Sequence, residues 1–384
     1  MELTEHSPVG VPLSIDALLE RTVATGASDL HLTAGSFPAV RRHGHIELLD
    51  DCPMLDPDLI RQLIYRITTT EQQKHLELKR QLDFAYGIRG LARFRVNAYY
   101  QRESLAAAFR TIPADIRSLE QLGLPSSLHE LTTKPRGLVL VTGPTGSGKS
   151  TTLASMIDEI NGKRTDHIIT IEDPIEFLHH HKRCIVNQRE IGQDATGFAD
   201  ALRGALRQDP DVILLGEIRD LDTLETALKA ADTGHLVFST LHTTDATQTI
   251  NRVLSFYPPH QQSEVRFALS TALAAIVSLR LVPRADRPGR VPAAEVLINT
   301  AAVREQIRDL NATLNIPDLI KEGTSQYGMQ SFDQSLMQWY TKGVISYESA
   351  LFYASNPSEF ALRVQGVAGS SDTSWDGFQT ATAP

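Results

Sequence analysis

Apolar runs alternate with amphipathic segments through the middle of the chain. Four short apolar runs occupy residues 137–142, 167–171, 212–215 and 236–241. Segments with apolar residues at helical spacing separate them, and this alternation is typical of parallel strands joined by helices. The pattern therefore predicts an α/β domain whose parallel sheet is covered on both faces.

The first 113 residues show a different pattern. Ser14 can cap a helix that Gly26 ends, and a second helical stretch spans about 55–79. Strand-like segments occupy residues 29–33, 37–41, 92–99 and 104–111, and the third alternates clearly between apolar and polar residues. We predict a small α+β domain over residues 1–113.

Composition shifts mark the remaining boundaries. A connector rich in Leu, Pro and Ser covers 114–130, and the α/β domain, with helices at its end, covers 131–365. The tail 366–384 is rich in Gly, Ser, Thr and Asp, which predicts disorder. The least polar stretch, 267–282, is short for a membrane span, so we expect a buried helix there.

Bulk composition narrows the class of protein. The 384 residues are 41% hydrophobic and 22% charged with a net charge of −9, so no global basic field favours nucleic acid. The two cysteines, Cys52 and Cys184, form no zinc-binding pattern and fit a reducing compartment. The start of the chain lacks the features of a signal peptide. We expect a cytoplasmic protein.

A P-loop pattern follows the first apolar run. Residues 143–150 read Gly-Pro-Thr-Gly-Ser-Gly-Lys-Ser and lead into a segment of small residues with helical character. The glycines let backbone N–H groups surround phosphate, Lys149 can reach the β and γ phosphates, and Ser150 can ligate Mg²⁺. A flexible surface turn is the alternative, but the full pattern after a buried strand favours a nucleotide site. The predicted nucleotide-binding residues are Gly143, Pro144, Thr145, Gly146, Ser147, Gly148, Lys149, Ser150 and Thr151.

Polar residues follow the other three apolar runs as well. They comprise 172–176, Gly216 with Glu217, and 242–245. Ligands of open α/β sheets bind at the carboxyl ends of the strands, so we expect these segments to surround one nucleotide together with the P-loop.

Carboxylates in these segments are the candidate catalytic groups. Glu217 is expected to contact Mg²⁺ through water or to orient the attacking water, since Gly216 replaces the usual strand-end acid. A solvated strand terminus is its alternative. Within the acidic segment 172–176 we favour Glu176 as general base, with Glu172 and Asp173 in support. The alternative there is an acidic helix start.

Histidines and arginines give weaker signals. His235 and His242 bracket the strand at 236–241, and we interpret them as sensors of the nucleotide state, although lone histidines are usually structural. Arg93, Arg95 and Arg110 lie on strands of the N-terminal domain. They either form its exposed face or meet phosphates across a domain or subunit boundary.

Several stretches together resemble one protein family, the secretion ATPases of type II, type IV and type IV pilus systems. The resemblance covers about residues 14–360. It rests on Gly-Ala-Ser-Asp-Leu-His-Leu (26–32), Ala-Arg-Phe-Arg-Val-Asn (92–97), the P-loop, Thr-Ile-Glu-Asp-Pro-Ile-Glu (170–176), Gly-Glu-Ile-Arg-Asp (216–220) and Gly-His-Leu-Val-Phe-Ser-Thr-Leu-His-Thr (234–243).

The resemblance implies an architecture and further roles. It implies a PAS-like N-terminal domain, a RecA-like ATPase domain and a hexameric ring that uses ATP and Mg²⁺. Residues 170–176, 212–217 and 235–242 match the family's Asp box, atypical Walker B segment and His box. Arg95 and Arg110 match the arginines that approach ATP from the N-terminal domain.

Within the family, the chain resembles the pilus-retraction ATPases of twitching motility. The segment 300–308 occupies the place of the retraction motif but is altered at three inner positions, which leaves an accessory retraction paralogue or a related secretion ATPase as alternatives. The four-cysteine insertion of extension ATPases is absent from the sequence. The resemblance implies a homo-hexamer that acts on the pilus platform protein and is peripheral to the inner membrane.

Two other classes of function remain open from the residues. RecA-like rings include nucleic-acid translocases, but the acidic balance and the lack of a basic, aromatic-interleaved motif count against direct nucleic-acid binding. A non-catalytic nucleotide-binding regulator is the other, and Lys149 together with Glu217 counts against it.

Overall fold

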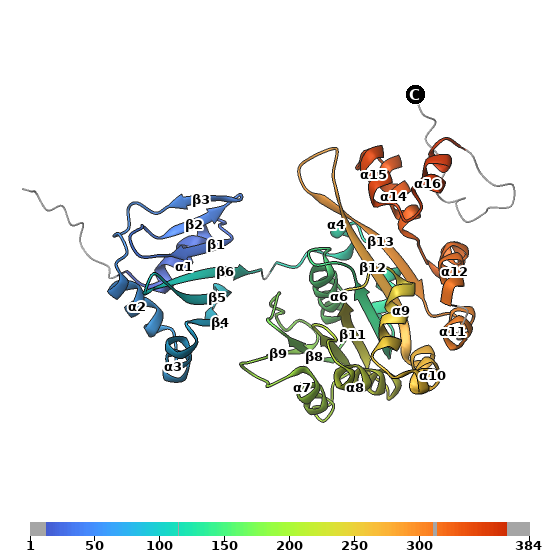
Figure 1. Ribbon diagram of the computed structural model, residues 1–384, viewed down its shortest axis with the longest axis horizontal. Helices are drawn as coiled ribbons and strands as arrows, with labels where there is room; N and C mark the ends of the chain where they lie inside the picture. The colour runs from blue at the N-terminus through green and yellow to red at the C-terminus, as the bar shows by residue number, and fades with distance from the viewer. Residues whose placement is uncertain (1–12, 114, 310–312, 367–384) are drawn as a thin grey trace, which may run out of the picture. The chain divides into compact units, whose positions relative to one another are not determined.

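The computed structural model describes residues 13–113, 115–309 and 313–366. The contacts divide the chain into two compact units, Met1–Ala114 and Asp115–Pro384, shown in Figure 1. The predicted tail lies outside the described residues from 367 onward, as do 1–12, 114 and 310–312. Within the described ranges, no helix is both long and apolar enough to cross a membrane.

The N-terminal unit is a six-stranded antiparallel sheet with helices. Its strand order is β3-β2-β1-β6-β5-β4. The strands are β1 Asp29–Leu32, β2 Ala39–Arg42, β3 His45–Leu48, β4 Gln81–Ile88, β5 Ala92–Gln101 and β6 Ser104–Ile112. Apolar residues of the sheet and of the three helices form one core. The α+β prediction is thus confirmed.

Local capping sets the helices of this unit. They are α1 Ile15–Ala24, α2 Pro57–Arg66 and α3 Thr70–Lys79. Ser14 caps α1 through the N–H of Ala17, as its sequence predicts. Thr69 forms a capping box that starts α3, so the predicted helical stretch 55–79 is divided in two.

The second unit contains a seven-stranded sheet of order β13-β12-β7-β11-β10-β8-β9. Its strands are β7 Gly137–Thr142, β8 His167–Glu172, β9 Ile185–Glu190, β10 Val212–Leu215, β11 Leu236–Leu241, β12 Leu273–Pro283 and β13 Arg290–Ile298. All neighbouring pairs are parallel except β12 and β13. The four predicted strands therefore form the parallel centre of the sheet.

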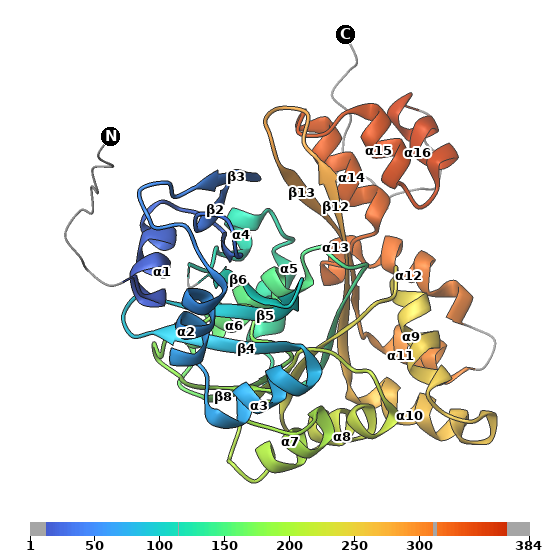
Figure 2. The same cartoon turned by 60° about the vertical axis from the view of Figure 1, so that its left-hand side comes forward.

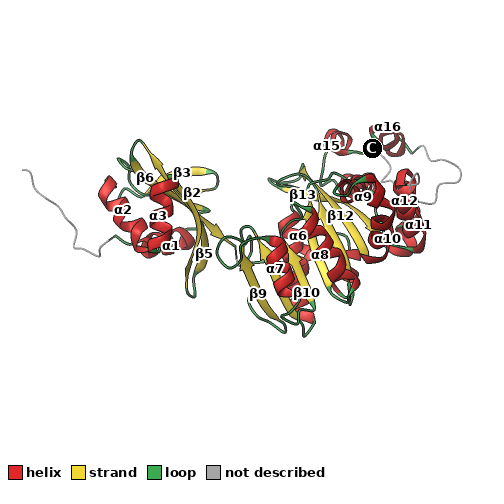
Figure 3. Cartoon of the chain, turned by 60° about the horizontal axis from the view of Figure 1, so that its bottom comes forward, coloured by secondary structure: helices red, strands yellow, loops and turns green. Residues whose placement is uncertain are grey.

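Helices cover both faces of this sheet (Figure 3). On one face, α4 Leu119–Leu122, α5 Ser127–Thr132 and α6 Lys149–Lys163 pack on the sheet. The other face is covered by α7 Phe198–Ala205, α8 Leu221–Asp232, α9 Ala246–Ser255, α10 Gln262–Ala272, α11 Ala301–Arg308 and α12 Ile316–Glu322. This arrangement follows from strands that are apolar on both sides.

The expectation of one buried helix over 267–282 is wrong. Helix α10 ends at Ala272, and Leu273 begins strand β12, which lies between β7 and β13. An apolar run that is buried all round carries no periodic signal, so a helix and a central strand look alike in sequence.

The last helices form a separate small core against the β12–β13 hairpin. They are α14 Phe332–Thr341, α15 Tyr347–Tyr353 and α16 Pro357–Val364, preceded by the short α13 Thr324–Tyr327. Figure 2 shows them grouped near that hairpin. Their apolar residues pack with Val282, Val291 and Ala293 of the two strands.

Candidate functional site

The sheet brings the predicted polar segments to one edge. Strands β7, β11, β10 and β8 are adjacent and parallel, so their carboxyl ends lie side by side. The P-loop follows β7, His242 follows β11, and Glu217 follows β10 by two residues. The segment 172–176 begins at the end of β8.

The P-loop has the backbone that its glycines require. Gly143 has φ of +139°, and Gly148, with φ of +99°, precedes the first residue of α6. A Cβ on Gly143 would lie 2.5 Å from the carbonyl oxygen of Leu279 and 2.5 Å from Ser147 Oγ. This close approach leaves no room for a side chain. The loop leads into the N-terminus of α6, where backbone N–H groups are suited to bind an anion.

Lys149 lies back over the same loop. Its Nζ donates to the carbonyl oxygens of Gly143 at 2.8 Å and Pro144 at 3.0 Å. Burial lowers the pKa of Lys149, and the nearby Glu217 carboxylate opposes that shift. The ammonium therefore sits at the centre of the loop, within the electrostatic reach of Glu217.

Glu217 is held by two neighbours. Arg219 Nη2 donates to Glu217 Oε1 at 2.5 Å, and His242 Nε2 lies 3.6 Å from Glu217 Oε2. Arg219 also reaches Asp173 at 3.3 Å, so it links the ends of β10 and β8. The hydrogen bond from Arg219 is the main cause that holds the pKa of Glu217 below its ordinary value. Glu217 is thus a fixed, ionised carboxylate beside the P-loop lysine.

Gly216 lies beside the end of β8 and is hydrogen-bonded to β11. A Cβ on this residue would lie 3.4 Å from Cα of Glu172 and 3.5 Å from the carbonyl oxygen of Ile171. Its own carbonyl accepts from Thr240 Oγ1 at 2.7 Å. This hydrogen bond fastens the Glu217 segment to β11.

The carboxylates at the two ends of the acidic segment 172–176 differ in burial. Glu172 is buried and accepts from Thr170 Oγ1 at 2.7 Å and from the N–H of Glu176 at 3.3 Å. Burial raises the pKa of Glu172. Glu176, by contrast, is exposed. The assignment of Glu176 as general base, with Glu172 and Asp173 in support, stays a prediction.

The two histidines lie at opposite edges of the sheet. His242 is beside Glu217, whereas His235 precedes the six residues of β11, which span about 20 Å at 3.3 Å per residue. His235 Nδ1 lies 2.9 Å from the carbonyl oxygen of Ala230 in α8. Sensing by His235 remains a prediction, and it would have to act through the length of β11.

The arginines of the N-terminal unit share one face of its sheet. Arg95 and Arg110 are directly paired between β5 and β6, and both are exposed. Arg110 Nε donates to Asp29 Oδ1 at 2.8 Å. Phe94 and Val96 point into the core, so alternation places Arg93 and Arg95 on the other face. Their contact with phosphate stays a prediction.

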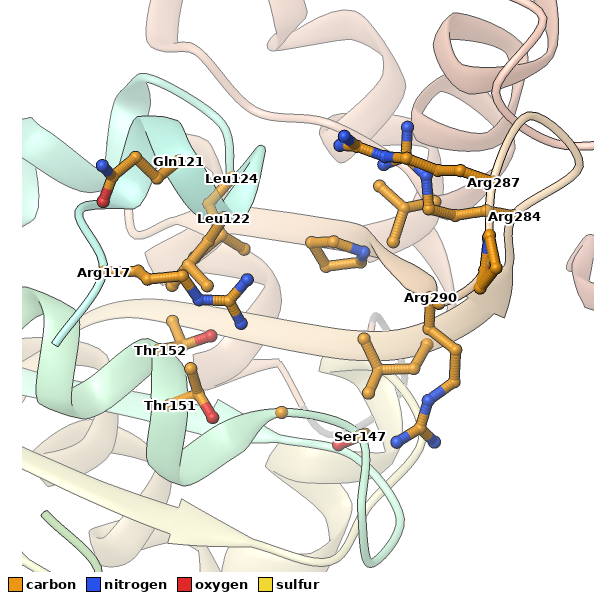
Figure 4. A pocket seen from close by; sticks show the side chains of 16 residues that line it. Arg117, Gln121, Leu122, Leu124, Ser147, Thr151, Thr152, Arg284, Arg287 and Arg290 are labelled. Atoms are coloured by element: carbon orange, nitrogen blue, oxygen red, sulfur yellow. The ribbon is translucent and has the colours of Figure 1, made fainter. Parts of the chain in front are cut away.

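A pocket of about 680 Å³ adjoins the P-loop (Figure 4). Ser147, Gly148, Thr151 and Thr152 form one wall. The other walls come from Arg117, Gln121, Leu122 and Leu124 and from the β12–β13 hairpin, including Arg284, Arg287 and Arg290. In Figure 4 the Arg117 side chain is directed toward Thr152 and that of Arg290 toward Ser147. The pocket continues the phosphate loop into a basic, partly apolar space.

The residues present fit Mg²⁺ held chiefly by phosphate and water. Ser150 is exposed at the first turn of α6, and Glu217 is an ionised carboxylate. The described part of the chain contains no group of three His, Cys, Asp or Glu residues that could hold a metal alone. Such sparse protein ligation is usual for Mg²⁺ at phosphate sites.

Sequence reasoning gave no role to Arg219 or to the hairpin arginines. Arg219 stands two residues after Glu217 within a recognised motif, so its charge was visible while its partners were not. The spacing Arg-x-x-Arg-x-x-Arg over 284–290 was a signal for a basic hairpin.

The fold and the P-loop define a P-loop ATPase with a RecA-like domain. The model of the type II/IV secretion system protein family matches residues 2–315. The chain therefore belongs to the type II/IV secretion system protein family.

Within this family, the chain is similar to proteins of type IV pilus systems. The chain is 46% identical over 348 residues to the type IV pilus retraction ATPase PilT of Pseudomonas aeruginosa, covering 91% of this chain and 100% of that protein. It is 41% identical to the type IV pilus ATPase PilU of the same organism, over 92% of each chain. The crystal structure of the pilus retraction motor PilT with bound ADP has a TM-score of 0.83 at 48% identity. That match covers 91% of this chain and 99% of the other.

Proposed function

We propose that this protein is an ATP-hydrolysing motor that powers type IV pilus retraction. The observation that carries the proposal is the single sheet edge at which Lys149 and Glu217 come together. The full-length similarity to PilT supports pilus retraction as the process that this site drives.

Each residue of the site has a chemical task in this proposal. The P-loop N–H groups and Lys149 bind the β and γ phosphates and stabilise the charge that develops during transfer. Glu217, oriented by Arg219, polarises the attacking water, and Glu176 and His242 line the same edge. Mg²⁺, held by Ser150 and through water by Glu217, would neutralise phosphate charge.

The basic pocket takes the nucleoside part of ATP. Ser147 and Gly148 of the P-loop line it together with Thr151, and its volume suits a nucleoside. The guanidinium of Arg117 offers a planar cation that can stack on the base.

A ring is the assembly that this function requires. We propose a homo-hexamer in which Arg95 and Arg110 reach the ATP bound by a neighbouring subunit. The ring would act on the pilus platform protein and be peripheral to the inner membrane. Two exposed arginines side by side on one sheet face support this role.

Phosphate release by the purified full-length chain tests the enzymatic part. Lys149→Ala is expected to lower turnover by about 10²–10³-fold, because the site loses a preorganised charge. Lys163→Ala is the matched control, since Lys163 lies at the other end of α6 and pairs with Glu159. Glu217→Gln should bind ATP and fail to hydrolyse it. Equal turnover of Lys149→Ala and wild type would overturn the site.

Retraction is tested in a piliated bacterium that lacks its retraction ATPase. The wild-type chain should restore twitching, and Glu217→Gln should not. If the chain hydrolyses ATP but restores twitching neither by itself nor together with a second retraction ATPase, pilus retraction is refuted and the ATPase assignment stands. The similarity to PilU favours an accessory retraction motor as a second candidate. In that case restoration would require a second retraction ATPase in the cell.

Subunit mixing tests the arginines. Arg95→Ala and Glu217→Gln subunits should each be inactive, and their mixture should recover part of the activity if a site combines residues of two subunits. Arg95→Lys should not substitute, because lysine lacks the planar fork. No recovery in mixed rings would place the arginine and the glutamate of one site in the same chain.

A further inference from the structure

A row of polar side chains crosses the sheet beside the P-loop. Thr142, the last residue of β7, pairs with Ser278 of β12, and Ser278 pairs with Glu295 of β13. Thr142 Oγ1 donates to Ser278 Oγ at 3.0 Å. Ser278 lies opposite Glu295 in the β12–β13 pair, and its hydroxyl acts to lower the pKa of Glu295. A continuous row of polar side chains therefore leads from the residue before Gly143 to Glu295.

Glu295 also holds the start of helix α9. Its Oε1 accepts from the N–H of Ala246, the first residue of α9, at 2.8 Å. The N-terminus of a helix favours a carboxylate because its N–H groups lack partners within the helix. Glu295 thus joins two elements that are distant in sequence, a strand of the sheet and the helix that follows β11.

The segment between β11 and α9 is the one that carries His242. It contains residues 242–245, with His242 beside Glu217 at one end and Asp245 as the N-cap of α9 at the other. Leu241, which precedes His242, pairs with Thr142 across β11 and β7. Both ends of the segment are therefore fixed to the row that Glu295 completes.

The carboxyl of Glu295 is a costly group in this place. Glu295 is only 9% exposed, and burial raises its pKa to about 7. Two charged groups face it: Asp245 raises its pKa further, and Arg280 of β12 opposes the shift. Arg280 in turn donates to the carbonyl oxygen of Tyr353 and lies over the ring of Phe332. A leucine could fill such a site without this desolvation cost, so packing alone does not explain the carboxyl group of Glu295.

We propose that Glu295 is a positioning residue that ties the His242 segment and helix α9 to the strand carrying the P-loop. ATP turnover then depends on a carboxyl that touches neither nucleotide nor metal. The inference rests on the proposed ATPase function and adds a residue to it.

Steady-state ATP turnover by the full-length chain tests this role. Glu295→Leu removes the acceptor for the Ala246 N–H, and we expect kcat to fall by about tenfold to a hundredfold, since small displacements near a reacting group have such effects. KM for ATP should stay within about threefold, because the P-loop contacts remain. Glu295→Gln keeps an oxygen acceptor and should retain most of the turnover.

A second variant removes the same hydrogen bond from the other side. Ala246→Pro deletes the donated N–H at the first position of a helix, where proline is well accepted. Asp245 before it is extended, with φ of −156° and ψ of 173°, which suits a residue that precedes proline. Ala246→Pro should lower kcat as Glu295→Leu does, and the double variant should be no slower than the slower single variant.

Gln330→Leu provides the matched control. Gln330 is buried on the other side of β13, where its Nε2 donates to the carbonyl oxygen of Ala294 at 2.9 Å. Its replacement should cost stability but leave kcat unchanged. If folded Glu295→Leu and Ala246→Pro turn over ATP at the wild-type rate, or if Gln330→Leu lowers kcat equally, the role of Glu295 is refuted. A wild-type chain that releases no phosphate would instead refute the proposed function.

Discussion

Replacement of Gly143 by alanine tests the P-loop geometry most directly. The new Cβ would meet the carbonyl oxygen of Leu279 and Ser147 Oγ, each at 2.5 Å. Ser147 can change its rotamer, but the Leu279 carbonyl belongs to the backbone of β12 and cannot rotate away. The φ of +139° is also strained for any residue with a side chain.

The magnitude follows from these two effects. Overpacking in a well-filled region costs about 1–3 kcal/mol, and a side chain in this backbone region costs about 1–3 kcal/mol more. The sum is about 2–6 kcal/mol, which lowers the melting temperature of a domain of this size by about 4–24 °C. Displacement of the loop should also weaken ATP binding, because its N–H groups no longer converge on phosphate.

Thermal unfolding and binding of a fluorescent ATP analogue measure the two consequences. Gly162→Ala is the matched control, because Gly162 is exposed in helix α6, which follows the P-loop, and a Cβ there meets nothing within 4 Å. It should be neutral or stabilise the fold by up to about 1 kcal/mol. Wild-type melting and wild-type ATP affinity in Gly143→Ala would show that the close approach to Leu279 is not present.

Three further predictions concern charged residues. Arg219→Ala should shift the acid limb of the kcat pH profile to higher pH, because Glu217 loses the hydrogen bond that lowers its pKa. If the limb does not shift, titration of Glu217 is not its cause. Glu295→Gln should flatten the pH dependence of urea unfolding between pH 4.5 and 7. Because the native pKa of Glu295 is about 7, the wild type loses roughly 3 kcal/mol of unfolding free energy as the pH rises from 4.5 to 7. Equal pH dependence of unfolding in the wild type and in Glu295→Gln would contradict this prediction. Arg304→Ala on the exposed face of α11 should leave ATPase activity normal and abolish twitching. Normal twitching would show that this face has no role in retraction.

The two arginines of α11 differ in their contacts. Thr300 caps this helix. The spacing of Val303, Ile307 and Leu310 predicts one apolar face, and Val303 and Ile307 are buried, whereas Leu310 lies outside the described residues. Arg308, however, donates to Ser270 Oγ at 2.8 Å and lies over the ring of Phe267 in α10. Its replacement would disturb the packing of α11 on α10, so Arg304 alone gives the cleaner variant.

The parts of the site that are local in sequence could be predicted, and the parts that depend on distant partners could not. The P-loop is eight consecutive residues after a buried strand, so the positions of its glycines predict the backbone conformation of the loop. The gathering of four strand ends followed from parallel pairing. Glu295, in contrast, is a single acid in an apolar strand, and its partner Ala246 is 49 residues away. Nothing in the sequence marks that distance as a contact.

The same limit applies to side-chain orientation. His235 and His242 flank the same strand, β11, and its length places them at opposite ends of that strand. Glu172 and Glu176 belong to one turn, yet one is buried and the other exposed. Sequence spacing shows which residues are neighbours along an element, whereas the burial of each depends on how the neighbouring strands pack.

The position of Lys149 has a consequence for the release of product. Its ammonium is already engaged by two carbonyl oxygens of its own loop. Any phosphate that takes this cation competes with the protein itself, and a departing phosphate leaves no unpaired charge behind. Each such hydrogen bond contributes about 0.5–1.5 kcal/mol, so the internal competition weakens nucleotide affinity by roughly five- to a hundredfold. A motor must release its product in every cycle. Because Lys149 can return to the two carbonyl oxygens of its loop, product release is faster.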